Sequence, residues 1–349
     1  IVGMLLAAST GIVGATVVTM GMLSLPTMLK AGYDQKIATG TICAAGTLGQ
    51  IIPPSIVLVL LADILQGANE EAALISGNLA PEPITAIDLF AGAMMPGMML
   101  VCMFILFIYI YAKIYPLSCP PIETTRSRLE IYIEAFKNVL PPLILILLVL
   151  GSILLGIATP TESASVGAAG ASLLAFAKGE LTFKNLKDVS FNTVKLSSFV
   201  FVILIGASMF SLVFRGFNGD ELIEHALGGL PGGQVGALII VMLAIFVLGF
   251  FLDYIEIIFV IVPLVGPVLI ANGADPLWLG IMISLNLQTS FLTPPFGFSL
   301  FFLRGVAPPE IQTKNIYRGV IPYIGIQVIA IIVVGFIPEI ATWLPRKIF

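Results

Sequence analysis

Long apolar runs separated by short polar segments make up most of the chain. A membrane-spanning helix needs about 20 mostly apolar residues. The runs do not alternate apolar and polar residues at every second position, as transmembrane β-strands do. The pattern therefore predicts membrane helices, with apolar runs at 37–61, 91–112, 139–157, 160–177, 192–214, 236–271, 277–303 and 321–343.

Two segments do not have the length of a simple span. The run at 236–271 is too long for one crossing and too short for two crossings with a loop. We predict that it forms two half-length helices, a re-entrant hairpin. Residues 1–29 predict a similar hairpin that is truncated at its start. Because the chain begins with Ile1 inside an apolar segment, we interpret it as a fragment without its first helices and not as a signal peptide.

Residues that typically form turns or break helices recur at one fixed spacing. A proline, a glycine, an aspartate and a proline pair occur twice in the same order, and each matched pair is 241 positions apart, as Pro26 and Pro267 are. Proline and glycine are frequent in membrane helices, which accounts for one or two matches but not for five at one offset. We predict an internal repeat with the matched residues Pro26, Gly32, Asp34, Pro53, Pro54 and Pro267, Gly273, Asp275, Pro294, Pro295.

The charges of the loops predict their side of the membrane, because cytoplasmic loops carry an excess of Lys and Arg. Cationic and acidic segments alternate, which predicts an inside position for 30–36, 113–138, 178–195 and 304–320 and an outside position for 62–90 and 215–234. Arg346 and Lys347 then fall outside, against the rule. The two repeat copies have opposite orientations in this scheme. Inverted repeats are typical of secondary transporters, whose site lies near the midplane where the repeats meet.

Each repeat copy contains a proline pair inside an apolar run, Pro53-Pro54 and Pro294-Pro295. Proline lacks an N–H group and clashes with the preceding turn, so each pair predicts a helix that unwinds within the membrane. The freed carbonyl groups need protein, water or an ion as partner. Carbonyl and hydroxyl oxygens suit a hard cation such as Na⁺, and the helix that starts after each break attracts an anion such as a carboxylate.

Two carboxylates interrupt the second predicted hairpin. Asp253 and Glu256 lie in an apolar segment without a basic neighbour in the sequence. A carboxylate at the bilayer centre costs about 2.5–3.5 kcal/mol on insertion scales, which makes such a residue a functional hypothesis by default. We expect Asp253 to serve an ion site or to stabilise the hairpin tip, with a helix cap as the structural alternative. For Thr289, Ser290 and Thr293 the structural alternative is a hydrogen bond to the preceding turn.

Composition excludes several other classes of protein. The chain is 58% hydrophobic and 10% charged, whereas soluble chains carry about 25% charged residues. The three cysteines form no CxxC motif, and His225 cannot build a metal site alone. No basic stripe suggests nucleic acid, and no metal cluster, Ser-His pair or phosphate loop suggests an enzyme. At the Thr159-Pro160 corner, we expect Thr161 to cap the helix that begins near Glu162.

Several stretches resemble the large membrane subunit of tripartite ATP-independent periplasmic (TRAP) transporters, the DctM type. The longest reads GATVVTMGMLSLPTMLKAGYDQKIATGTICAAGTLGQIIPPSIVLV, and three others read GIATPTESASVGA, GFFLDYIEIIFVIVPLVGPV and NLQTSFLTPPFGFSLFFLRGVAP. The last two, in this order and spacing, are highly specific. The resemblance covers nearly the whole chain.

The resemblance implies an elevator-type carrier of the ion-transporter superfamily, an all-α polytopic membrane protein. Each inverted repeat would contain a re-entrant helical hairpin followed by a broken transmembrane helix. The implied divisions are a first hairpin and broken helix (1–65), an external acidic loop (66–90), scaffold and connecting helices (91–235), a second hairpin and broken helix (236–305) and a C-terminal helix (306–349).

The resemblance also implies Na⁺ sites where each hairpin tip meets its broken helix. The first tip here is Ser9-Thr10-Gly11, where family members often have a Ser-Gly-Ser type. Carried over by motif, the Na⁺ ligands would be Ser9, Gly11, Gly46, Thr47 and Gly49 at one site and Asp253, Thr289, Ser290 and Thr293 at the other. The residues implied for substrate binding are Thr10, Gln50, Ser55 and Gln288.

The implied partners are a small four-helix membrane subunit, a periplasmic solute-binding protein and an organic-acid substrate, in the bacterial inner membrane. The implied coupling ion is Na⁺, with no organic cofactor. Two alternatives remain open at this point: a secondary carboxylate carrier that works without a binding protein, and a channel.

Overall fold

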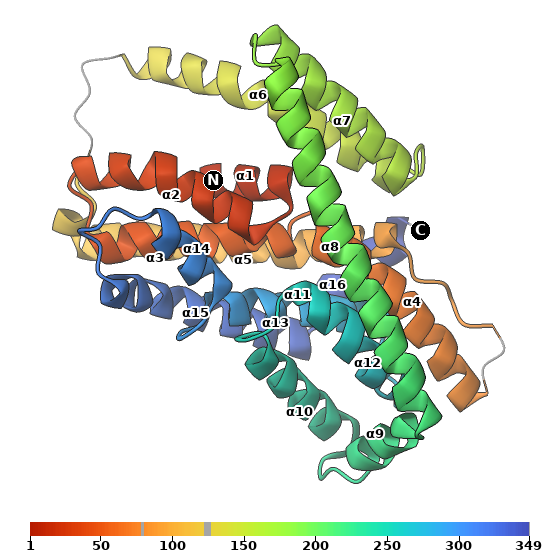
Figure 1. Ribbon diagram of the computed structural model, residues 1–349. Coiled ribbons are helices and arrows are strands. Elements are labelled where there is room, and N and C mark those ends of the chain that lie inside the picture. The colour runs from red at the N-terminus through yellow and green to blue at the C-terminus, as the bar shows by residue number, and fades with distance from the viewer. Residues whose placement is uncertain (78–79, 122–126, 349) are drawn as a thin grey trace. The chain divides into compact units, whose positions relative to one another are not determined.

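The computed structural model describes residues 1–77, 80–121 and 127–348 (Figure 1). Within these residues every regular element is a helix and no strand occurs. Six helical segments are long and apolar enough to cross a membrane, and a bent pair of helices would make a seventh. The predicted all-helical polytopic membrane fold is therefore confirmed. The six segments are Val13–Lys30, Ala86–Ile114, Ile133–Leu154, Phe183–Gly216, Tyr254–Ala271 and Thr313–Phe336.

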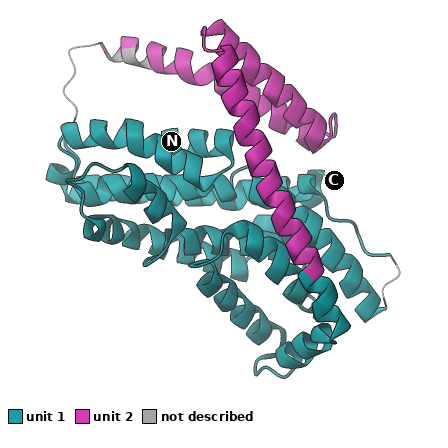
Figure 2. Ribbon diagram, viewed as in Figure 1, with its two compact units in different colours: residues 1–121, 210–349 teal, residues 122–209 magenta. Residues whose placement is uncertain are grey.

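The described residues fall into two compact units, coloured separately in Figure 2. One unit combines residues 1–121 with 210–349, and the other spans 122–209. The smaller unit holds α6 (Arg128–Leu154), α7 (Pro160–Ala177) and most of α8 (Phe183–Gly216). Its helices α6 and α7 pack together and share a hydrogen bond of 2.9 Å between the hydroxyls of Ser152 and Ser163.

The start of α7 corrects one prediction. Thr159, and not Thr161, caps this helix: its hydroxyl accepts a hydrogen bond from Glu162 N, and the Glu162 carboxylate accepts one from Thr159 N at 2.8 Å. This reciprocal arrangement is a capping box. The prediction was wrong because Pro160 occupies the first helical position, which its fixed φ favours, so the cap lies one residue before it.

The larger unit contains both copies of the predicted repeat. The first copy consists of a hairpin and a helix that breaks after Gln50, with the bounds α1 (Val2–Thr10), α2 (Val13–Lys30), α3 (Gln35–Thr47), the 3₁₀ turn η1 (Leu48–Gln50) and α4 (Ile56–Ser76). The second copy has the bounds α10 (Gly233–Leu248), α11 (Tyr254–Glu256), the π-helical segment η3 (Ile257–Ile261), α12 (Val262–Ala271), α13 (Pro276–Leu292) and α14 (Phe298–Val306).

The two copies share the residues that form turns, cap helices and break helices. The second arm of each hairpin, Val13–Lys30 and Tyr254–Ala271, has the same bounds at the offset of the sequence repeat. The matched glycines Gly32 and Gly273 both have a positive φ, 85° and 99°, which glycine adopts without the penalty of a Cβ atom. The matched aspartates Asp34 and Asp275 both cap the helix that follows. Both proline pairs lie in breaks between helices, as predicted, and both are joined by cis peptide bonds.

The broken helices of the two copies lie side by side and run in opposite directions. The carbonyl oxygen of Cys43 accepts a hydrogen bond from Ser299 Oγ at 2.9 Å. The carbonyl oxygen of Gln50 accepts one from Ser284 Oγ at 3.0 Å. As the residue number rises from Cys43 to Gln50 in the first copy, the number of the partner residue falls from 299 to 284 in the second copy. The two segments therefore pair in antiparallel fashion. This pairing is the structural counterpart of the inverted repeat.

Helix α13 lies at the centre of the larger unit. Every residue from Trp278 to Leu292 is buried, and α13 packs against α3, α4, α5, α10 and α15. Helix α5 spans Ala86–Ile114 and α15 spans Thr313–Phe336. By contrast, most of the apolar side chains of α6 and α8 are exposed, as lipid-facing helices require.

Helix α15 packs against α3 at very close range. Gly40 of α3 lies against the backbone of Gly319, and Gly319 lies against the carbonyl oxygen of Lys36. A Cβ atom at either glycine would collide with backbone atoms of the other helix. Beyond this contact, Tyr323 Oη and Thr41 Oγ1 lie 2.7 Å apart.

Several boundaries differ from the predicted runs and loops, among them the start of α6 at Arg128 and of α8 at Phe183. The run predicted at 321–343 is two helices, because α15 ends at Phe336 before Pro338 and α16 (Glu339–Ile348) is a separate amphipathic helix. Helix α4 continues to Ser76, so part of the predicted acidic loop is helical. The segment predicted as the loop 215–234 contains α9 (Gly219–Gly228), which meets α10 at a bend of 118°.

Candidate ion and substrate site

The tip of the first hairpin lies against the first break. Helix α1 ends at Gly11, whose φ of 62° is the left-handed conformation that glycine favours, and Gly11 N donates to Ala7 O at 2.9 Å. A Cβ atom at Gly11 would lie 3.4 Å from the carbonyl oxygen of Pro54. A Cβ atom at Gly49 would lie 3.3 Å from the carbonyl oxygen of Ala7. The tip and the break are therefore close because both lack side chains at their contact.

The hydroxyl groups of the first tip bond within the hairpin. Thr10 Oγ1 lies 2.6 Å from Thr16 Oγ1 on the second arm, so one of the two hydroxyls donates to the other, which in turn donates to a carbonyl group of its own helix turn. Ser9 is exposed and its hydroxyl donates to Leu6 O at 2.8 Å. The structure thus places Thr10 at the inner side of the tip and Ser9 at its surface.

The Thr47 hydroxyl faces α15 and not the first hairpin tip, beside which its predicted role placed it. Its side chain is fully buried, and its hydroxyl donates to Ala44 O at 2.9 Å and accepts from Gln327 Nε2 at 3.1 Å. Gln327 belongs to α15, so the Thr47 hydroxyl points to α15, whereas the neighbouring Gly46 contacts Val17 of the first hairpin. Sequence reasoning missed Gln327, although a lone glutamine in the apolar run 321–343 was the available signal.

The first break satisfies its freed backbone with hydroxyl groups. Gln50 O, left over by the end of the 3₁₀ turn, accepts from Ser55 Oγ at 2.8 Å and from Ser284 Oγ at 3.0 Å. Ser284 lies in the second repeat copy and was not predicted. Because Ser55 donates its hydroxyl hydrogen to the break itself, only the lone pairs of its oxygen remain for a ligand.

The second hairpin tip also lies against its own break. The ring centroids of Phe251 and Phe296 are 5.4 Å apart, and those of Tyr254 and Phe291 are 6.2 Å apart. A Cβ atom at Gly249 would lie 2.8 Å from the Cβ atom of Ser290. The tip of the second copy, like that of the first, meets its break through small residues and contacts that flank the proline pair.

The carboxylates of the second tip have distinct environments. Asp253 Oδ1 accepts from Tyr254 N at 2.7 Å, so Asp253 caps α11, which is the structural alternative stated for it. Capping by one carboxylate oxygen is compatible with a second role for the other oxygen. Glu256 Oε2 is buried and has no hydrogen-bond partner among the residues that the structure describes. Glu256 is followed directly by the π-helical segment, an irregularity that is frequent at functional sites.

The hydroxyl groups of the second break bond to the preceding turn. Thr289 donates to Leu285 O, Ser290 to Leu287 O and Thr293 to Thr289 O, at 2.7–2.8 Å. This is the structural alternative stated for all three. Each bond uses the hydroxyl hydrogen and leaves lone pairs on the oxygen, which is the atom that a cation contacts. The second tip therefore brings a carboxylate and hydroxyl oxygens to one region.

Two glutamines predicted to bind substrate are buried with unpaired amides. Gln50 is 1% exposed and Gln288 is fully buried. In the described part of the chain, neither the amide oxygen nor the amide nitrogen of either side chain has a hydrogen-bond partner. Leaving a buried polar group unpaired costs about 1–3 kcal/mol. Such side chains fit a site that is completed by a bound molecule, and their assignment to substrate stays a prediction.

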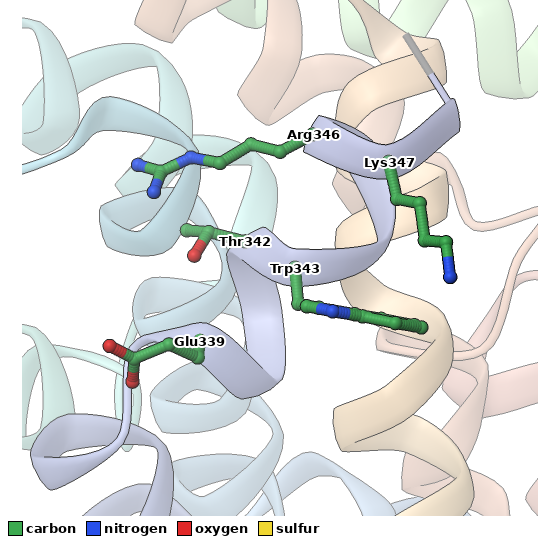
Figure 3. A pocket seen from close by; sticks show the side chains of 5 residues that line it. All are labelled: Glu339, Thr342, Trp343, Arg346 and Lys347. Carbon is green, nitrogen blue, oxygen red and sulfur yellow. The ribbon is translucent and has the colours of Figure 1, made fainter.

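Two surface cavities lie elsewhere, beside α16. One of about 360 Å³ is formed by α16 alone, where Lys347 Nζ lies 4.9 Å from the ring centroid of Trp343 (Figure 3). The other, of about 790 Å³, lies between α16, the segment 81–88 and the start of α13. Asp275 binds Arg346 there at 2.9 Å. Neither cavity is lined by a residue predicted to bind ion or substrate.

The architecture first defines a class of protein. A multi-pass helical membrane protein in which two hairpin and broken-helix units pair in antiparallel fashion has the architecture of a secondary transporter. The family is equally plain from sequence comparison. The DctM component of the tripartite ATP-independent periplasmic transporter matches residues 1–340, and the chain belongs to this family.

Characterised relatives are similar over almost the whole chain. The chain is 31% identical to the C4-dicarboxylate TRAP transporter large permease protein DctM of Vibrio cholerae, over 98% of this chain and 75% of the relative. It is 29% identical to the protein of the same description from Pseudomonas aeruginosa, with the same coverage. It is 30% identical to the ectoine TRAP transporter large permease protein TeaC of Halomonas elongata, over 97% of this chain and 74% of the relative.

Membership confirms several predictions. The chain is a permease subunit and not an enzyme, and the family implies a tripartite system with a small membrane subunit and a periplasmic binding protein. The family also implies the inner membrane as its location. The names of the relatives mention different solutes, so family membership alone does not define the substrate of this chain.

Proposed function

We propose that this chain is the large permease subunit of a TRAP transporter that takes up an organic acid together with Na⁺. The periplasmic binding protein delivers the substrate, and the two hairpins with their broken helices carry it across the membrane by an elevator movement. The observation that carries the proposal is the pairing of each hairpin tip with a break, at which helix ends expose main-chain groups.

The residues present fit Na⁺ as the coupling ion. The second tip would hold it with the carboxylate of Asp253 and the hydroxyl oxygens of Thr289, Ser290 and Thr293. The first tip offers neutral groups, since Gly11, Gly46 and Gly49 expose backbone and Ser9 adds a hydroxyl oxygen, while the hydroxyl oxygen of Thr47 lies on the α15 side of the same segment. Oxygen ligands of this kind suit a hard cation. Na⁺ would supply the charge that a carboxylate substrate needs in a low-dielectric site.

The substrate would bind between the two breaks. Gln50 and Gln288 have unpaired amide groups there, and the helix that begins after Ser55 directs its N-terminus to the break. Amide N–H groups and a helix N-terminus both favour a carboxylate. Relatives named for C4-dicarboxylate, ectoine and sialic acid define the compounds to test.

Uptake into proteoliposomes tests the proposal. The chain is reconstituted with its small subunit and binding protein, and uptake of each candidate solute is measured with a Na⁺, K⁺ or proton gradient. We expect saturable uptake that requires inward Na⁺ and the binding protein. Uptake that follows a proton gradient and ignores Na⁺ contradicts the coupling. Saturable uptake without the binding protein indicates an independent carrier, and non-saturating flux indicates a channel.

Substitution Asp253→Asn separates the charge of this residue from its cap. Asparagine caps helices as well as aspartate does, so α11 keeps its start while the carboxylate is lost. We expect Na⁺-driven uptake to fall by about tenfold or more, as loss of a charged ligand worth at least about 1.4 kcal/mol requires. Asp275→Asn, at the matching cap of α13, is the control and retains uptake. Normal uptake by the Asp253 variant would remove its proposed role.

A further inference from the structure

The glutamine of α15 has a fixed orientation and a free oxygen. The Thr47 hydroxyl gives its hydrogen to Ala44 O at 2.9 Å, so its oxygen accepts from the group that faces it. That group is therefore the NH₂ of Gln327, at 3.1 Å. The amide oxygen Oε1 of Gln327 is left over. Gln327 is 1% exposed, and within the described chain its Oε1 has no hydrogen-bond partner.

The free oxygen lies beside the first break. Helix α3 ends at Thr47, the residue to which Gln327 is bonded, and the 3₁₀ turn Leu48–Gln50 follows directly. The last carbonyl groups of a helix have no intrahelical partner, and the helix dipole makes this end negative. The backbone at this end of the helix therefore offers acceptors and no free N–H group to such an oxygen.

A second buried amide approaches the same turn from α13. Ser284 is bonded to Gln50 O, and Gln288 lies one turn further along the same face of α13. Because α13 runs antiparallel to α3, this turn leads from Gln50 back toward Thr47. At the offset of the repeat, Gln288 is the counterpart of Thr47. Gln50, Gln288 and Gln327 thus belong to three elements packed around the end of α3, and within the described chain the amide oxygen of each is unpaired.

The chemistry of this region favours a cation. No Lys, Arg or His occurs in the segments 37–62, 276–303 and 319–336 that surround it. Besides the unpaired NH₂ groups of Gln50 and Gln288, the groups that are available are neutral amide, hydroxyl and carbonyl oxygens beside the negative end of a helix. Such oxygens bind hard cations without the cost of burying a carboxylate.

We propose that Gln327 is a Na⁺ ligand, through Oε1, on the α15 side of the first break. This inference rests on the proposed function, since it adds to Na⁺ coupling a ligand that lies on neither hairpin. The hydrogen bond from the Gln327 NH₂ group to Thr47 fixes the side chain. The Gln327 Oε1 atom and oxygen atoms of the segment 47–50 then contact the ion. The amide of Gln288 borders the same space and links it to the substrate region.

The test measures Na⁺ binding without a substrate. The melting temperature of the purified protein is followed as NaCl replaces KCl at constant ionic strength. We expect the melting temperature of the wild type to rise with Na⁺ concentration, and the concentration that gives half of the full rise is the half-saturating Na⁺ concentration. In Gln327→Met, which keeps the volume but has no amide, this concentration rises about tenfold, as expected for one lost hydrogen-bonding ligand of a charge. Gln327→Glu retains the oxygen and binds Na⁺ at least as well as wild type.

A control variant exists on the same helix pair. Tyr323→Phe removes the hydrogen bond to Thr41, one turn before Gln327, and perturbs the contact of α3 with α15 without touching the site. Its melting temperature in KCl falls while the half-saturating Na⁺ concentration stays at the wild-type value. A purely structural Gln327 would behave in the same way, so an unchanged Na⁺ midpoint in Gln327→Met overturns the inference. If the wild type itself shows no Na⁺ response, the coupling proposed above falls together with it.

Discussion

The two breaks share one backbone design but differ in side-chain chemistry. The first copy is built from glycines at 11, 46 and 49, and its freed carbonyl is satisfied by serines. The second copy has Asp253 at its tip and Ser290 at the position that matches Gly49. The repeat therefore keeps the residues that bend the chain, while the predicted ligands differ between the copies. Two hairpin and broken-helix units of the same backbone design can in this way form one predicted site with a charged ligand and one with neutral ligands.

The largest expected effect tests the small-residue contact at the tips. In the first copy the matched positions hold Ala8 and Gly49, and in the second Gly249 and Ser290. Gly249→Ala places a Cβ atom 2.8 Å from that of Ser290 and should destabilise the protein by about 1–3 kcal/mol through overpacking, with loss of uptake. The double variant Gly249→Ala, Ser290→Gly recreates the pair of the first copy and should recover the melting temperature. A double variant no more stable than the single one contradicts the equivalence of the tips.

An intermediate effect is expected at the first break. Ser55→Ala together with Ser284→Ala leaves the buried carbonyl of Gln50 without its two donors, which should cost about 1–3 kcal/mol. The fall in melting temperature measures this cost. Each single variant leaves one donor and should lose less than half of the double effect. Additive losses from the two single variants would show that the serines do not share this acceptor.

The smallest effect compares the helix caps. Asp34→Ala and Asp275→Ala each remove the side chain that accepts from the first turn of the following helix, worth about 1 kcal/mol. Asp275 also binds Arg346 at the surface, which adds between 0 and about 1 kcal/mol. Thermal unfolding at low and high salt should show nearly equal losses, with only the Asp275 loss sensitive to salt. Salt sensitivity at Asp34 would contradict this assignment.

Sequence patterns predicted the parts of the fold that depend on local chemistry. Proline pairs, positive-φ glycines and capping aspartates act within a few residues, so the repeat and the breaks could be predicted. The predicted half-length helices were wrong in one respect, because the second hairpin arm Tyr254–Ala271 has 18 residues and is long enough to span a membrane. The end of α15 was missed because only Pro338 and Glu339 separate its apolar residues from those of α16. The cap of α7 was assigned two residues late because a threonine stands on either side of Pro160.

Side-chain partners that are far apart in the sequence could not be predicted. Thr47 was assigned to the hairpin tip, whereas its hydroxyl bonds to Gln327, 280 residues away. Ser284 serves the first break although it belongs to the second copy. Such pairings follow from how helices pack and not from residue type, so a motif carries the position of a ligand but not the direction of its side chain.

The meeting of Gly40 with Gly319 has a mechanical consequence. Two helices that touch backbone to backbone cannot slide past each other without separating, because no flexible side chain lies between them to yield. In the elevator movement proposed above, α3 and α15 would therefore move together as one unit. The boundary between the stationary and the moving parts of the permease would then lie outside this pair.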